Sequence, residues 1–178
     1  MPNWIGDLVM ATPILQDLRY AFPRSHITAL VQSPLSDILE MDPHINEIIP
    51  FERAPSRWDH FQGDQIVPKI CAGKYDLGVL LTNSLSSAWW FWRGGVKQRL
   101  GFKGHGRSCL LNTKGSFPEN RESQHLVLTY KQLLARMGIP PTSSSPKLYL
   151  SEGEKGGALH MIPPGGSKLI GINPGADY

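Results

Sequence analysis

One short segment places an acidic residue beside a glycine at the point where a loop runs into an apolar helix. Pro2-Asn3-Trp4-Ile5-Gly6-Asp7 is followed by leucines at helical spacing. Gly6 permits close approach of a ligand to the backbone, and a carboxylate such as Asp7 can act as a general base. The alternative is that Asp7 only caps the helix, which is the commoner role for aspartate at such a position. Either the helix kinks at Pro13, or its regular part begins with Thr12 as the cap, which would free Asp7 for chemistry.

A second candidate is a run of basic side chains separated by glycines, comprising Lys97, Arg99, Lys103, His105 and Arg107. Such a run is most often a solvated face. Glycine loops that carry arginine also suit the recognition of phosphate or carboxylate groups. We expect this stretch to lie in the same cleft as Asp7 and to hold an anionic ligand.

Two further patterns have ordinary alternatives. Asn173-Pro174-Gly175-Ala176 follows an apolar run and is typical of a turn that approaches a phosphate, although a plain strand-ending turn would look the same. The aromatic run from Trp89 to Trp92 is best explained by core packing. The alternative is contact with a membrane surface or a partner.

Composition narrows the class of protein. The chain has 178 residues, 19% charged residues and a formal net charge of +3, which suits an anionic substrate and does not indicate nucleic acid binding. Its two cysteines and six histidines have no metal-ligand spacing, so we expect no metal, no cofactor and no disulfide framework. No apolar run is long enough to span a membrane and no signal pattern is present, which predicts a cytoplasmic protein.

The elements that must position these residues alternate between strands and helices. This alternation predicts an α/β fold with a parallel sheet and right-handed crossovers. The buried-type run 77–81 favours parallel pairing in particular. Expected helices cover residues from about 7 to 22, 35–41, 64–72, 84–92 and 125–137, and expected strands cover 27–31, 45–51, 77–81, 99–102 and 169–172.

The Pro- and Ser-rich segment 140–146 is the best linker candidate. It divides the chain into a first domain (1–139), a linker region (140–166) and the first strand and turn of a second domain (167–178). A parallel α/β unit should have an apolar strand before Pro2, and a strand near the end should open another unit. We therefore expect the chain to be truncated at both ends.

The motifs together resemble the ADP-heptose:lipopolysaccharide heptosyltransferases of glycosyltransferase family 9, heptosyltransferase II type. The resemblance rests on PNWIGDLVMATPIL at 2–15, DLGVLLTNSLSSA at 76–88, RLGFKGHGR at 99–107 and GINPGADY at 171–178. It implies the Rossmann-like N-terminal domain of a two-domain GT-B enzyme that transfers heptose, with inversion and without metal, from ADP-heptose to the lipopolysaccharide inner core.

The resemblance also implies roles for residues. Asp7 would be the catalytic base. The phosphorylated acceptor would contact Asn3, Trp4 and Gly6 together with Lys97, Arg99 and Arg107, and the donor would contact Gly175 and Ala176. The protein would work in the cytoplasm, with the inner face of the inner membrane as one location, and this chain alone would be inactive. The alternative from another class is a non-catalytic Rossmann-like module that binds an anionic ligand or a partner.

Overall fold

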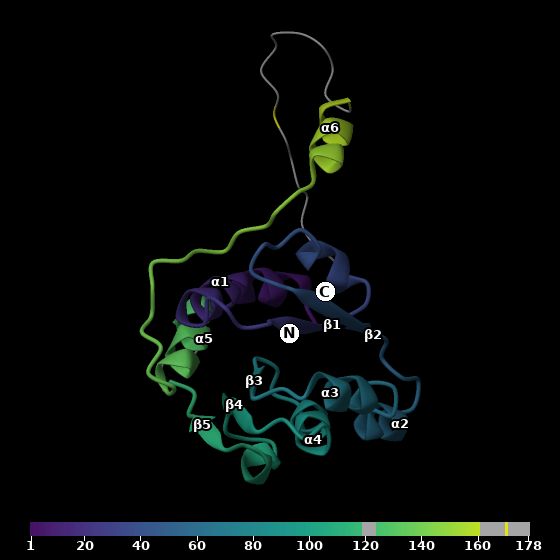
Figure 1. The fold of residues 1–178 in the computed structure, drawn as a ribbon, viewed down its shortest axis with the longest axis vertical. Helices are drawn as coiled ribbons and strands as arrows, with labels where there is room; N and C mark the ends of the chain where they lie inside the picture. The colour runs from purple at the N-terminus through teal and green to yellow at the C-terminus, as the bar shows by residue number, and fades with distance from the viewer. Residues whose placement is uncertain (119–123, 161–169, 171–178) are drawn as a thin grey trace.

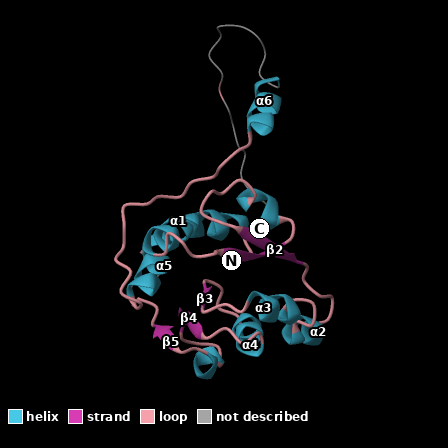
Figure 2. Cartoon of the chain, in the orientation of Figure 1, coloured by secondary structure: helices cyan, strands magenta, loops and turns pink. Residues whose placement is uncertain are grey.

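The strands form two separate parallel sheets (Figures 1 and 2) in a computed structural model that describes residues 1–118, 124–160 and 170. In the first sheet β1 (Thr28–Gln32) pairs with β2 (Glu47–Phe51). In the second, β4 (Gln98–Phe102) lies between β3 (Leu77–Leu80) and β5 (Thr113–Gly115). The predicted α/β class and the parallel pairing of the apolar run at Leu77 are confirmed.

The first helix, α1 (Ile5–Ala21), runs without a break through Pro13. Proline has no N–H, so the carbonyl of Val9 loses its normal helical partner. The Thr12 hydroxyl donates a hydrogen bond to that carbonyl at 2.9 Å and so replaces the missing donor. The arrangement in which the helix begins at Thr12 is therefore wrong.

The other helical elements connect the strands or follow them along the chain. Ser84 caps α4 by accepting a hydrogen bond from the Ser87 N–H, as expected for serine before an apolar run. Four elements have no counterpart among the predictions, namely α2, η2, β5 and α6. The helical segments are η1 (Leu35–Leu39), α2 (Arg57–Gln62), α3 (Val67–Gly73), α4 (Leu85–Arg93), η2 (Arg107–Leu110), α5 (Leu126–Ala135) and α6 (Glu152–His160).

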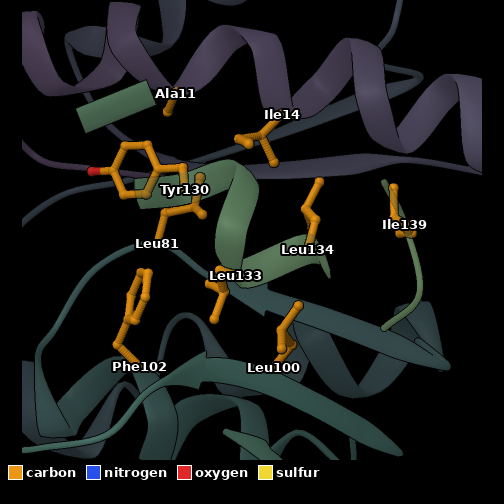
Figure 3. Close-up of a cluster of buried hydrophobic side chains, with 9 residues drawn as sticks. All are labelled: Ala11, Ile14, Leu81, Leu100, Phe102, Tyr130, Leu133, Leu134 and Ile139. Atoms are coloured by element: carbon orange, nitrogen blue, oxygen red, sulfur yellow. The ribbon is translucent and has the colours of Figure 1, made fainter. Parts of the chain in front are cut away.

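Helix α1 packs on both sheets. One cluster joins it to α5 and the second sheet (Figure 3) through Ala11, Ile14, Leu81, Leu100, Phe102, Tyr130, Leu133, Leu134 and Ile139. A second cluster joins the same helix to β1 through Leu8, Leu15, Ala29, Val31 and Leu39. Since these side chains are almost fully buried, α1 has a fixed position relative to both sheets.

The beginning of the predicted linker is bonded to the helices. The Asp17 carboxylate accepts hydrogen bonds from the hydroxyls of Thr142 and Ser144 at 2.6 and 2.7 Å, and it pairs with Lys131 at 3.4 Å. The Lys147 N–H donates to the Thr12 hydroxyl at 3.1 Å. These contacts hold residues 142–147 against α1, while the domain boundaries themselves stay a prediction.

Candidate functional site

Asp7 lies in the first turn of α1 and does not cap it. The N-cap residue is Trp4, whose extended backbone ends the loop, so Asp7 is the third residue of the helix. Its half-buried side chain makes no hydrogen bond or ion pair with any described part of the chain. A negative charge in a first turn is favoured by the helix dipole. The capping interpretation is therefore wrong, and the carboxylate is available to a ligand.

The loop around Asp7 is open to solvent. Asn3 and Gly6 are exposed, and the neighbouring Trp4 and Ile5 are 75% and 61% exposed. A Cβ built on Gly6 would meet nothing within 4 Å. Packing therefore does not require glycine here, and the open space beside Asp7 suits the approach of a ligand.

The loop after β3 lies next to this first loop. Asn3 and Thr82, Ser84 and Ser87 line one small cavity of about 40 Å³. The Thr82 hydroxyl donates to the Ser87 hydroxyl at 2.9 Å, and the Ser84 hydroxyl donates to it at 3.0 Å. The amino ends of α1 and α4 thus meet at the carboxyl edge of the sheets, where ligands of α/β proteins bind. No site residue was predicted in this second loop, although a serine before an apolar run signalled the start of α4.

Arg107 fixes the loop after β3 from inside the protein. Its guanidinium is fully buried and donates to the carbonyls of Phe102 and Thr82 and, at 3.0 Å, to the side-chain oxygen of Asn83. Burial lowers the pKa of Arg107 to about 10, which leaves it charged at neutral pH. The structure therefore places Arg107 behind the candidate site, and its predicted contact with the acceptor stays a prediction.

Lys97 and Arg99 lie at the other end of β4. Lys97 precedes the strand and pairs with Asp76 at 2.6 Å, and the Asp76 hydrogen bond raises the pKa of Lys97. The Arg99 guanidinium donates to the carbonyls of Val96 and Leu110. The basic stretch is thus divided between two edges of the sheet, and the structure does not bring Lys97 or Arg99 beside Asp7. Their acceptor-binding role stays a prediction.

Some predicted features have no described counterpart. Gly175 and Ala176, with the expected strand 169–172, fall outside the described residues except Ile170. Among the described residues no cluster of three or more His, Cys, Asp or Glu side chains could hold a metal ion. In the same part of the chain, no helix has the length and apolar character needed to cross a membrane.

Two curated relatives show the sequence similarity. The lipopolysaccharide heptosyltransferase 2 of Escherichia coli is 26% identical over 185 residues, covering 99% of this chain and 53% of the relative. The lipooligosaccharide heptosyltransferase 2 of Haemophilus ducreyi is 31% identical over 111 residues, covering 62% of this chain and 32% of the relative. The chain thus spans about half the length of the Escherichia coli relative.

Solved structures show the fold similarity. The glycosyltransferase family 9 protein of Veillonella parvula superposes with a TM-score of 0.77 at 21% identity, over 90% of this chain and 47% of that one. Escherichia coli ADP-heptose heptosyltransferase II gives 0.72 at 24% identity, over 90% and 48%. The fold is that of one half of a GT-B enzyme. Since the family model described as glycosyltransferase family 9 (heptosyltransferase) matches residues 65–178, more than half of the sequence, the chain belongs to that family.

Proposed function

We propose that this chain is the acceptor-side half of an inverting glycosyltransferase that moves heptose from ADP-heptose to the phosphorylated inner core of lipopolysaccharide. The observation that carries the proposal is the unpaired carboxylate of Asp7. It lies in the first turn of α1 beside an exposed loop, at the edge where α1 and α4 both begin. Family membership supplies the class of reaction.

In the proposed reaction, Asp7 accepts the proton of an acceptor hydroxyl while that oxygen forms a bond to the anomeric carbon of the heptose. The bond from this carbon to the diphosphate oxygen breaks on the opposite face, which inverts the configuration and releases ADP. The charge on the leaving diphosphate requires cations or backbone N–H groups. We assign Gly175 and Ala176 to that donor side.

The acceptor side is proposed to use the first loop. Asn3, Trp4 and Gly6 are exposed next to Asp7 and could contact a sugar face and its hydroxyls. The enzyme is proposed to work in the cytoplasm, with the inner face of the inner membrane as one location. The 178-residue chain alone would not transfer heptose, because a GT-B site is completed by a second domain.

The test uses this chain joined at its carboxyl end to the matching half of the Escherichia coli relative. Asp7→Asn should reduce turnover of ADP-heptose with an inner-core acceptor by roughly two to four orders of magnitude, the range for a general base. Asp59→Asn is the matched control, because Asp59 is exposed and is also the third residue of its helix. Near-normal turnover in the Asp7 variant would contradict the catalytic role.

Acceptor binding without any transfer by the hybrid would instead favour the second candidate function, a binding module. Loss of transfer confined to the Asp7 variant would support the transferase, whereas binding without transfer by the unsubstituted hybrid would support the binding module. Inversion is tested separately, by the anomeric configuration of the product.

A further inference from the structure

The small cavity beside the first loop has a histidine on its wall that was not among the predicted site residues. Its polar lining consists of Asn3, His60, Thr82, Ser84 and Ser87, and its volume is about 40 Å³. None of the described residues on its wall is Asp, Glu, Lys or Arg, and the rest of the wall is mostly apolar. One water needs roughly 10–15 Å³ of such space. The cavity can therefore take one hydroxyl-bearing arm of a ligand, and it is too small for a whole sugar ring.

Trp90 fixes the position of His60 on this wall. The Trp90 indole N–H donates to the carbonyls of His60 and Phe61, at 3.1 and 2.9 Å, and so ties α2 to α4 beside it (Figure 1). The imidazole meets the Trp90 ring edge to face, with 5.0 Å between the ring centroids. Because Trp90 is almost completely buried, the imidazole has a rigid support.

The imidazole of His60 is neutral and has unused hydrogen-bonding capacity. Burial and the positive charge of Arg53 hold its pKa below the ordinary value of 6.5, so the ring is uncharged at neutral pH. Neither ring nitrogen makes a hydrogen bond or an ion pair with the described residues. A neutral imidazole has one N–H donor and one acceptor nitrogen. His60 can therefore donate one hydrogen bond to a ligand and accept another.

The hydroxyls of the loop after β3 complement this imidazole. Those of Thr82 and Ser84 both donate to the Ser87 hydroxyl, which donates to the Ser84 carbonyl at 3.0 Å. The Ser84 hydroxyl oxygen accepts from the Ser87 N–H and the Ser86 hydroxyl, each at 3.2 Å. Thr82 has used its one proton, and its oxygen has no donor among the described residues, so it can only accept from a ligand. An acceptor at Thr82 and a donor at His60 match one hydroxyl group, which both donates and accepts.

We propose that this cavity binds one exocyclic hydroxyl of the acceptor sugar and that His60 is a specificity-determining residue. The proposal rests on the proposed function, which supplies the sugar, and the cavity shares Asn3 with the loop that carries Asp7. An exocyclic hydroxyl projects from its ring, so it reaches a cavity that the ring does not enter. The uncharged wall favours a hydroxyl over a phosphate, because an anion would lose water here without gaining a cation.

The test uses the same hybrid enzyme with the intact inner-core acceptor and with acceptors in which one exocyclic hydroxyl at a time is replaced by hydrogen. His60→Ala should raise the Kd of the intact acceptor about tenfold, the size of one lost hydrogen bond, measured by calorimetry. It should leave kcat within about twofold. One deoxy acceptor should bind the unsubstituted hybrid equally weakly. His60→Ala should add nothing to that loss, because both changes remove the same hydrogen bond.

Three further variants separate the hydrogen bond from packing. His60→Phe retains a ring against Trp90 and lacks both nitrogens, so it should show the same selective loss. Thr82→Val removes the acceptor oxygen with little change of shape, and it should weaken the same acceptor. His160→Ala is the matched control, because His160 is exposed at the end of α6, and it should change neither Kd nor kcat.

Two results would overturn the proposal. One is equal weakening of the intact and of every deoxy acceptor by His60→Ala and His60→Phe, since the histidine would then only support the fold. The other is an unchanged Kd in both variants. A hybrid that shows the selective loss of affinity and transfers no heptose would support binding of the hydroxyl and contradict the transferase function.

Discussion

At the scale of single residues, the candidate site depends on two positions with opposite structural roles. Gly6 is in open space and contributes nothing to packing, whereas Arg107 is completely enclosed. Because Gly6 has an ordinary helical environment, alanine should fit there and favour the helix. The proposed contact of the acceptor with Gly6, which needs close approach to the backbone, would explain a glycine here.

We expect Gly6→Ala to raise the free energy of unfolding by up to about 1 kcal/mol, since alanine loses less backbone entropy in a helix. The same substitution should weaken binding of the inner-core acceptor, measured by calorimetry. Gly156→Ala is the control, because Gly156 also has open space around its Cβ position and lies in α6. Unchanged acceptor affinity would remove Gly6 from the site.

Arg107 allows a second test at this scale. Arg107→Met should lower the free energy of unfolding by about 2–4 kcal/mol, because buried acceptors on Phe102, Thr82 and Asn83 lose a charged donor. Denaturant unfolding measures the loss without any ligand. Arg136→Met, at an exposed position, should change stability by less than about 0.5 kcal/mol. Stability unchanged by Arg107→Met would contradict the stabilising role of these hydrogen bonds.

At the scale of elements, the sequence predicts the strands and helices that have a strong local pattern of apolar residues. The apolar runs at β1, β2 and β3 were predictable because buried parallel strands need them. Helix α2 was not, since none of its residues is buried and it has no apolar stripe. Strand β5 has three residues, Thr-Lys-Gly, with no strand pattern, and α6 contains three glycines, which disfavour helix.

The candidate site also has a part that the sequence predicts and a part that it does not. The loop at Asp7 was identified from residues that are consecutive in the chain. The contact of Arg107 with Thr82 and Asn83 joins positions 24 or 25 residues apart, and it depends on how β3 and β4 are paired. The sequence shows a run of basic residues but not the register of β3 and β4. The division of this run between two edges of the sheet was therefore not predictable.

At the scale of the whole molecule, both sheets depend on α1 and on the groups enclosed between them. The Met1 amino group is one of these, although Met1 as a whole is half-buried. Burial lowers the pKa of this amino group from 8.0 to about 5. Between pH 5 and 8 the amino group is therefore protonated in the unfolded chain and neutral in the folded chain.

This difference makes the stability of the 178-residue chain depend on pH. The unfolded state binds more protons between pH 5 and 8, so stability should rise with pH across this window and fall on acidification. A shift of three pH units corresponds to about 4 kcal/mol between the two ends. Burial and Arg53 also lower the pKa of His60, which adds a change of stability with pH of the same sign.

The experiment therefore compares the free energy of unfolding in urea, as a function of pH, for the chain and for its N-terminally acetylated form. Acetylation removes the amine and leaves His60 unchanged, so the acetylated chain should lack most of the dependence. Parallel curves for the two forms would mean that the amino group is solvated in the folded chain.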